Sequence, residues 1–402
     1  MEKKLKWELA DIFRKFGDNY RRVHRMPLSH HKVMHVVKVC RTSYLGGHMR
    51  KCDSCGYEHP TYNSCGNRHC PKCQSLAKLR WVAKRQEELL PVNYFHNVFT
   101  IPHRLNGLAR YNKKLIYDIL FRSVSETLTQ FGKNELGGKL GFLSILHTWD
   151  QKLAQHIHLH CIIPDGALSG DRKSWIRSAN NDFLFSVRAL SKVFRGKFLY
   201  YLKEAYSTGK LAIAGKSTEF TSEDRFYSLI NDLYKENWVV YSARPFAGPL
   251  KALDYLGRYA FRIAISNDRI KGVAGSMVTF TYRDRKDGNI KKDITLPAGE
   301  FIRRFLLHVL PCSYMRIRHF GFLSNRNRKE NIACVKRLLG LNPDAGEGKE
   351  QSTQDLMLKI TGKDIFKCPR CRSGTMTSDH LIPRFSAWVD SQLSKPELID
   401  TS

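Results

Sequence analysis

The chain has 402 residues, with 67 Lys or Arg against 37 Asp or Glu, so its formal net charge is +30 at pH 7. A balance this basic favours a polyanionic partner, most often nucleic acid. No run of 18 apolar residues occurs, and the charged, amphipathic N-terminus lacks the apolar core of a signal peptide. We therefore expect a cytoplasmic protein without a membrane span, whose eleven cysteines stay reduced and bind metal.

The first part of the chain combines helical patterns with a cysteine-rich segment. Residues 1–40 and 76–90 have helical patterns, and residues 49–74 between them are rich in Cys, Gly and small polar side chains. Residues 1–85 contain 19 basic and 6 acidic side chains. We predict that residues 1–90 form a helical and zinc-binding DNA-docking domain.

Two Cys-x2-Cys pairs within that segment predict one structural zinc site. Cys52 and Cys55 form the first pair, Cys70 and Cys73 the second, and 14 residues separate the pairs. Two thiolates in each tight turn complete a tetrahedral shell, which leaves no open position for water. We therefore expect Zn2+ with a structural role.

Other side chains of the same segment are less defined by their pattern. Cys65 and His69 stay open as alternative zinc ligands. Arg68 and Lys72 are candidate DNA contacts, although a run of charges is also typical of a solvated face.

Residues 91–340 alternate between strand and helix patterns. Runs of β-branched and aromatic residues indicate strands, and Asp287-Gly288 favours the turn of a hairpin. In chain order we expect a strand at 93–102, a helix at 106–131, a hairpin of strands at 138–150 and 157–164, helices over 186–236 and 250–262, a second hairpin at 277–296, and helical segments to 339.

The stretch QHIHLHCII, residues 155–163, places His156, His158 and His160 at alternate positions. Residues two apart share one face of a strand, so the imidazoles point one way and the apolar residues between them face a core. Two such imidazoles and a third polar ligand can bind a divalent ion, and an open site of this kind can polarise a phosphate oxygen. The alternative is an exposed strand face that carries histidines without a metal. Three histidines at alternate positions disfavour this alternative.

Downstream, Tyr255 and Tyr259 lie four residues apart, and Arg258 and Arg262 form a neighbouring row with the same spacing. On a helix each pair shares a face. Tyrosine has an ordinary pKa of about 10 and becomes a useful nucleophile only where a metal or cation stabilises the phenolate. Most tyrosine pairs with this spacing serve packing, so the pair acquires meaning from the histidine strand. The two arginines are candidate DNA contacts.

These motifs resemble a known family. Residues 158–163, HLHCII, resemble the His-hydrophobic-His motif of HUH endonucleases, and the later tyrosines resemble their two-tyrosine branch. The N-terminal SCGNRHCPKC and the segments 301–311 and 316–326 narrow the resemblance to two-tyrosine rolling-circle transposases of bacterial insertion sequences. The resemblance covers about residues 20–340.

This resemblance implies an α+β fold in which helices pack on an antiparallel sheet, with the histidine motif on a central strand and a small zinc-binding domain before it. It implies a nucleoid-associated transposase that nicks and rejoins single-stranded DNA at element ends and target. Mg2+ or Mn2+ is held by His158, His160 and a third ligand, while a tyrosine attacks phosphorus and forms a 5′-phosphotyrosine. Which of the two tyrosines acts first stays open.

The identity of the third ligand stays open at this point. His156 is the first choice because it shares the strand face. His147, Asp150 and Gln151, on the preceding strand and turn, are the alternatives.

Residues 341–402 differ in composition, with 8 basic and 9 acidic side chains. We expect a linker and a C-terminal tail with a lone CxxC, Cys368 and Cys371. Cys312, Cys334 and His380 are open as its partners.

Two other functions stay open. A plasmid-type replication initiator would use the same chemistry, whereas a non-catalytic zinc-ribbon regulator would bind DNA without cleaving it.

Overall fold

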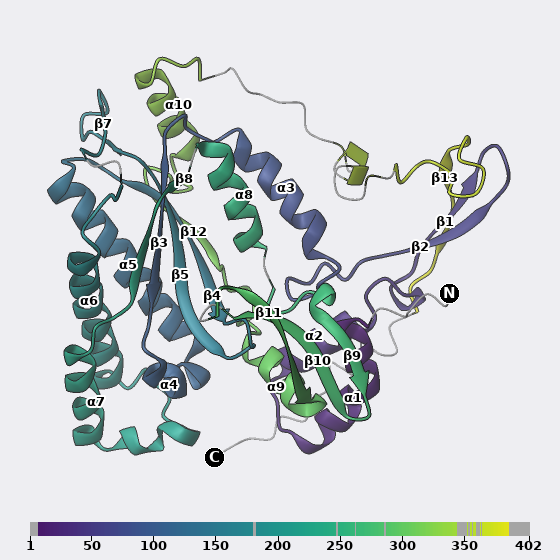
Figure 1. Cartoon of the computed structure of the whole chain (residues 1–402), viewed down its shortest axis with the longest axis horizontal. Helices are drawn as coiled ribbons and strands as arrows, with labels where there is room; N and C mark the ends of the chain where they lie inside the picture. The colour runs from purple at the N-terminus through teal and green to yellow at the C-terminus, as the bar shows by residue number, and fades with distance from the viewer. Residues whose placement is uncertain are drawn as a thin grey trace.

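The computed structural model describes residues 7–179, 182–246, 248–261, 263–284, 287–343 and 364–385, together with 352, 354–355, 357–358 and 362. Over these residues the chain has the expected α+β fold, with helices packed on antiparallel sheets (Figure 1). The described α-helices are α1 Leu9–Val23, α2 Leu28–Lys38, α3 Gln74–Gln86, α4 Asn106–Tyr111, α5 Lys113–Glu135, α6 Val187–Ser207, α7 Glu223–Lys235, α8 Pro249–Ala260, α9 Ala298–Leu307 and α10 Arg328–Leu338. The described strands are β1 Gly47–Cys52, β2 Glu58–Tyr62, β3 Tyr94–Thr100, β4 Gly141–Trp149, β5 Gln155–Pro164, β6 Ala167–Leu168, β7 Trp175–Ile176, β8 Val240–Phe246, β9 Ile270–Ala274, β10 Met277–Asp284, β11 Ile290–Pro297, β12 Ile317–Gly321 and β13 Met376–Ile382.

The central sheet has five antiparallel strands in the order β12-β4-β5-β3-β8, so the histidine strand β5 occupies the middle. Apolar residues between the histidines, such as Ile157 and Leu159, join the main core with side chains of α5 and α6. On the other face, Ile145 and Ile162 pack against α8 and α10. Because both faces are covered, the central strands are mostly apolar, and their buried polar residues include the histidines, Asn97 of β3 and Ser144 of β4.

The N-terminal helices α1 and α2 do not pack by themselves. Their apolar faces share a core with α9 and with the three-stranded sheet β11-β10-β9, where Phe13 meets Phe305 at a ring-centroid distance of 5.6 Å. The expected boundary at residue 90 therefore does not separate two cores, since residues 264–309 complete the core of the first helices.

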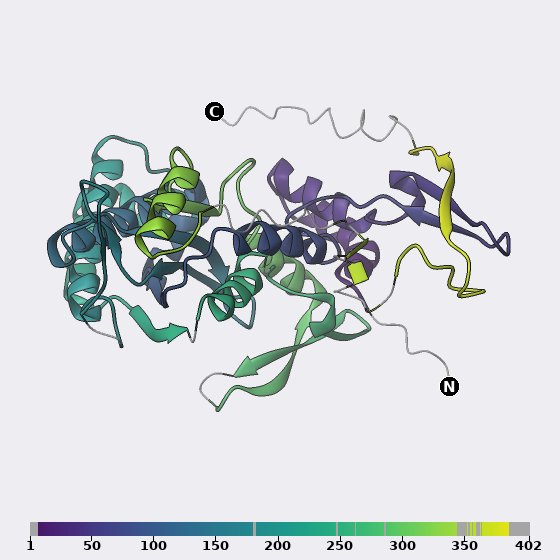
Figure 2. The same cartoon turned by 90° about the horizontal axis from the view of Figure 1, so that it is seen from above.

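The C-terminal part differs from the expected tail. Strand β13 pairs with β1 over Gly47–Cys52, which gives a sheet of order β13-β1-β2. Figure 2 shows β13 lying beside β1 and β2, away from the central sheet. The expectation of a tail with a lone CxxC is wrong, because Cys368 and Cys371 lie against the cysteines beside β1.

Several elements formed where the residue pattern predicted them, including both hairpins and the tyrosine helix α8. The edge strands β8 and β12 were not predicted. Strand β8 contains Pro245, which lacks a ladder donor and is tolerated at a sheet edge. None of the described helices combines the length and apolar character needed to span a bilayer.

Candidate active site and metal sites

Three histidines converge at the middle of the central sheet. Ring nitrogens of His147, His158 and His160 all lie within 4.8 Å of one another, and each of these side chains is at most 8 % exposed. His147 of β4 stands directly opposite His158 of β5 in the ladder, and residues so placed have Cβ atoms about 5 Å apart. We call these three residues the histidine centre.

The outer nitrogens of this centre have partners that fix how the rings face. Nδ1 of His158 lies 2.9 Å from the carbonyl oxygen of His156, which assigns it as the N–H donor. Nδ1 of His160 lies 2.9 Å from Nε2 of His96. Metal-binding histidines are usually held in this way by a second partner on the ring.

The inner nitrogens fit a cation. Nε2 of His158 and Nε2 of His160 are 3.1 Å apart. Two neutral acceptor nitrogens at this distance repel each other unless a proton or a cation lies between them. Nitrogens bound at right angles about 2.1 Å from one ion would be about 3.0 Å apart, so the donor set suits a shared metal.

The third member of the centre is His147 rather than His156, the first choice. His156 shares the face but lies beyond the convergence point, where its ring stacks on His103 with centroids 5.3 Å apart. Asp150 is not part of the converging group, and its Oδ1 accepts the backbone N–H groups of Lys152 and Ala154 in the turn. The regular register of the β4–β5 ladder sets His147 directly across from His158, and the register shifts only beyond it, between His147 and Trp149.

Tyr255 of α8 reaches the same place. Its hydroxyl lies 3.2 Å from Nε2 of His96, the nitrogen that also faces His160. Its ring packs on His96 at 4.6 Å and on Phe246 at 5.0 Å between centroids. Burial lowers the pKa of His96 to about 4, so this imidazole is neutral at pH 7, and its Nε2 is shared between the Tyr255 hydroxyl and Nδ1 of His160. His96 carried no signal in the sequence, because its neighbours are set by strand pairing alone.

The remaining residues of the tyrosine segment are only partly placed. Arg258 and Tyr259 belong to α8, three and four residues beyond Tyr255. Their side chains lie outside the described part of the structure. Arg262 lies outside the described residues altogether.

The histidine centre and Tyr255 line a cleft of ≈ 1250 Å³. This exceeds the range of about 300–1,000 Å³ usual for small-molecule sites, and so favours a larger substrate. Its wall carries aromatic and cationic side chains, namely Trp149, Trp238, Tyr241, Tyr282, Arg104, Lys152 and Arg283. Such a combination suits nucleic acid, because bases stack on aromatic rings and phosphates pair with cations.

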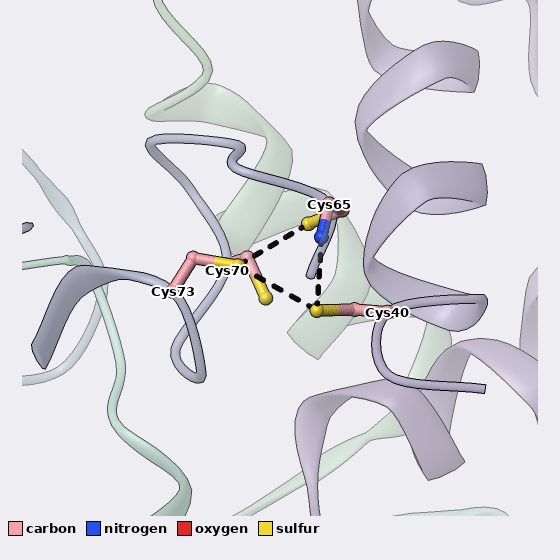
Figure 3. Close-up of side chains that lie close together, drawn as sticks. All are labelled: Cys40, Cys65, Cys70 and Cys73. Atoms are coloured by element: carbon pink, nitrogen blue, oxygen red, sulfur yellow. Dashed lines mark hydrogen bonds between the residues drawn. The ribbon is translucent and has the colours of Figure 1, made fainter. Parts of the chain in front are cut away.

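Four cysteines near the N-terminus form a second kind of site (Figure 3). Sγ of Cys73 lies 3.5 Å from Sγ of Cys40 and 3.6 Å from Sγ of Cys65, and Cys70 completes the group. The predicted grouping of Cys52 and Cys55 with Cys70 and Cys73 is therefore wrong. The first cysteine site, as we call it, consists of Cys40, Cys65, Cys70 and Cys73.

Of the two alternative zinc ligands in that segment, only Cys65 lies with the other cysteines. Cys65 belongs to the first cysteine site, whereas Nε2 of His69 faces the backbone N–H of Leu310 at 3.4 Å. Cys73 is the N-cap residue of α3, and α3 packs on α8. The two helices approach closely at Gly257 of α8, where an added Cβ would lie 2.6 Å from the side chain of Val82 on α3. The first cysteine site therefore supports the helix that carries Tyr255.

Cys52 and Cys55 form a second cysteine site with Cys368 and Cys371. All four sulfur atoms lie within 4.8 Å of one another, although the two pairs come from opposite ends of the chain.

The two candidate DNA contacts beside the cysteines already have partners within the chain. The Arg68 guanidinium donates to the carbonyl oxygen of Tyr314, and Nζ of Lys72 lies 2.6 Å from a carboxylate oxygen of Glu8. Their contact with DNA stays a prediction.

Comparison with known proteins defines the class. Residues 12–101 match the family described as "Transposase zinc-binding domain", and residues 141–331 match the family described as "Putative transposase". The chain is 40 % identical over 400 residues to "Putative transposase y4qJ" of Sinorhizobium fredii (strain NBRC 101917 / NGR234), with 98 % of each chain covered. It is 28 % identical over 339 residues to the transposase for insertion sequence element IS801 of Pseudomonas savastanoi pv. phaseolicola, with 83 % of this chain and 79 % of that one covered.

No solved structure matches the chain. A zinc-binding domain joined to a transposase domain defines the protein as a DNA transposase. The chain belongs to the two-tyrosine rolling-circle transposases of bacterial insertion sequences, the family that its histidine and tyrosine motifs resemble.

Proposed function

We propose that this transposase nicks and rejoins single-stranded DNA through a 5′-phosphotyrosine formed at the histidine centre, with Tyr255 as the first nucleophile. One observation carries the proposal. The hydroxyl of Tyr255 lies 3.2 Å from His96, which lies 2.9 Å from His160, so nucleophile and metal-binding residues meet in one cleft.

His147, His158 and His160 would hold the catalytic cation. When bound, a divalent ion polarises a phosphate oxygen and makes the phosphorus easier to attack. Imidazole nitrogen suits transition metals better than Mg2+, which prefers oxygen ligands. Of the two candidates, Mn2+ should therefore support activity at lower concentration than Mg2+.

The residues around the cation orient the attacking group. Neutral His96 lies within hydrogen-bonding distance of the Tyr255 hydroxyl and holds its oxygen in the cleft. As that oxygen bonds to phosphorus, the bond from phosphorus to the 3′ oxygen of the neighbouring nucleotide breaks. The phenol proton is balanced by the proton gained on the released 3′-OH, and one phosphodiester replaces another, so rejoining needs no ATP.

Tyr259 lies on the same helix, one turn beyond Tyr255. A second tyrosine allows attack on a second junction while the first still holds a strand. We propose this role for Tyr259.

Single-stranded DNA is the substrate that the cleft favours. Rings of Tyr241 and Tyr282 line it together with Arg283 and Lys152. Unstacked bases can pack on such rings, whereas paired bases in a duplex already stack on one another.

Covalent adduct formation tests the proposal directly. Labelled oligonucleotides from the ends of the element, single-stranded and duplex, would be incubated with Mn2+ or EDTA and resolved on a denaturing gel. We expect a Mn2+-dependent adduct on single strands, strongly reduced in Tyr255→Phe and absent in the variant that lacks both Tyr255 and Tyr259. Tyr200→Phe, an exposed tyrosine on α6 outside the cleft, is the matched control and should form the adduct normally.

Two outcomes would overturn the proposal. An adduct that persists in the double variant would place the nucleophile elsewhere. Tight, salt-sensitive DNA binding without any cleavage would favour the non-catalytic regulator.

A further inference from the structure

We infer that the second cysteine site binds its own zinc ion and clasps residues 364–385, the C-terminal segment, to the N-terminal sheet. The zinc-binding family matches only residues 12–101, which contain Cys52 and Cys55 but not their partners Cys368 and Cys371. The clasp therefore completes the zinc-binding domain from the far end of the chain.

The sulfur spacing fits a tetrahedral ion. Sγ of Cys52 lies 3.7 Å from Sγ of Cys371, and Sγ of Cys55 lies 3.8 Å from Sγ of Cys368. Four thiolates about 2.3 Å from one Zn2+ would be about 3.8 Å apart at tetrahedral angles. A disulfide requires about 2.05 Å, so these are thiol pairs with room for an ion between them.

Both halves of the site adopt the same turn. The N–H of Gly56 donates to the carbonyl of Cys52, and the N–H of Arg372 donates to the carbonyl of Cys368, at 3.2 and 3.0 Å. The residue after the second cysteine has a positive φ in each half, +65° at Gly56 and +60° at Arg372. An arginine in this conformation is held there only where its surroundings require it. Two matching knuckles that face each other are what a four-thiolate zinc site needs.

The two halves also approach more closely than ordinary side chains allow. A Cβ added at Gly374 would lie 2.5 Å from Sγ of Cys52 and 2.7 Å from Oδ1 of Asp53. The N–H of Gly374 lies 3.3 Å from Sγ of Cys371, where it can stabilise a thiolate. Gly374 therefore marks a position where any larger residue would separate the cysteine pairs.

Apolar packing alone is too small to hold this module together. Among the described residues its core has three buried members, and two of them, Cys52 and Cys368, are the proposed ligands beside Met376. Further out, Leu381 of β13 is 72 % exposed. Small modules without a sufficient core depend on a metal or a disulfide, and zinc binding then supplies folding free energy.

Contacts around the clasp tie it to the segment as a whole. Arg50 of β1 donates to the carbonyls of Ile365 and Met376 at 2.9 and 2.8 Å, and its guanidinium stacks over Phe366. Asp53 accepts the backbone N–H of Thr375 at 2.8 Å. These contacts orient the C-terminal segment, and the proposed zinc ion fixes that segment to the N-terminal sheet.

Zinc stoichiometry of the purified full chain tests the inference. In a chain that carries His158→Ala/His160→Ala, so that the histidine centre takes up no zinc, we expect two zinc ions per chain with both cysteine sites intact and one when Cys368→Ser/Cys371→Ser is added. Gly374→Ala removes no sulfur and should also lower the content towards one. Cys312→Ser, which changes an exposed cysteine outside both sites, is the control and should keep two.

Thiol protection provides a second readout that needs no variant. In the wild type, an alkylating reagent should modify Cys312 rapidly, and Cys52, Cys55, Cys368 and Cys371 only after a chelator removes the metal. After chelation, a protease should release the C-terminal segment.

The opposite results would overturn the clasp. With the histidine centre removed by His158→Ala/His160→Ala, one zinc per chain with both cysteine sites intact, or two after the serine changes, would contradict it. Alkylation of the second cysteine site at the rate of Cys312 before chelation would also contradict it, whether or not the variants fold.

Discussion

The histidine centre and the second cysteine site hold their metal donors by opposite means. His147, His158 and His160 come from two adjacent strands within 13 residues of chain, and the ladders on both sides pin them. Cys55 and Cys368 are 313 residues apart, and the two segments meet through the pairing of β1 with β13 and the contacts beside it, with a small buried core.

The two sites also differ in how many positions they leave for other ligands. Three imidazoles beside a cleft of ≈ 1250 Å³ leave coordination positions for substrate oxygen. Four thiolates close a tetrahedral shell. The difference teaches that the rigid, open site is suited to chemistry and the closed site to architecture. Loss of the histidine centre should lower the rate of adduct formation without changing the stability of the fold. Loss of the second cysteine site should lower stability without changing that rate.

The largest expected effect is on the histidine centre. His160→Ala should reduce adduct formation by about 10³-fold, since the metal contributes several kcal/mol to the transition state. The melting temperature should stay close to that of the wild type. His156→Ala, on the same strand face but outside the centre, should stay within a few-fold. Equal losses in both variants would show that the whole strand face matters rather than the three converging rings.

His96 should have the next largest effect. His96→Ala removes the partner of both the Tyr255 hydroxyl and His160 Nδ1. Changing such supporting groups commonly costs about 10- to 100-fold in metal affinity or activity. We expect a lower adduct rate and a higher Mn2+ concentration for half-maximal adduct, with partial rescue by His96→Gln. A lower adduct rate at an unchanged Mn2+ requirement would show that His96 acts on Tyr255 alone and does not support metal binding by His160.

The first cysteine site should connect stability with activity. Cys70→Ser should lose one zinc and lower the melting temperature, and adduct formation should fall because α3 begins at Cys73 and packs on the tyrosine helix. Cys368→Ser/Cys371→Ser should release the C-terminal segment with little change in adduct rate. Equal losses of adduct formation in the two variants would contradict the claim that only the first cysteine site supports the tyrosine helix.

The smallest effect concerns histidines outside the histidine centre. Burial lowers the pKa of His308 and His319 to about 3, whereas in the unfolded chain it is about 6.5. Below pH 6.5 the unfolded chain therefore binds protons that the folded chain excludes, and the free energy of unfolding should fall by about 1 kcal/mol per pH unit for each histidine. Urea unfolding at pH 7.5 and pH 5 measures this loss, and His308→Gln should make the dependence on pH shallower. A free energy that rises as the pH falls would contradict the assignment of neutral buried histidines.

Local patterns predicted one site well and the other poorly, for a physical reason. Alternation along β5 placed His158 and His160 on one face, and the short loop before it predicted the hairpin that brings in His147. The choice between His147 and His156 depended on the register in which β4 pairs with β5, which no spacing along one strand reveals.

The cysteine pairs were recognised as knuckles, but pattern alone cannot tell which two knuckles meet. Cys40 stands alone just after α2, and Cys368 belongs to a segment that returns to β1 only through pairing with β13. Edge strands β8 and β12 were missed for the same reason, since neighbours distant in sequence define them.

Peptide mapping of the covalent adduct tests the central claim most directly. The wild type would be trapped with Mn2+ and a single-stranded end sequence, digested, and the DNA-bearing residue identified by mass spectrometry. Attachment at Tyr255 through a 5′ phosphate is the predicted result. Attachment at Tyr259 alone, or at a tyrosine outside α8, would contradict the assignment of Tyr255 beside the histidine centre as the first nucleophile.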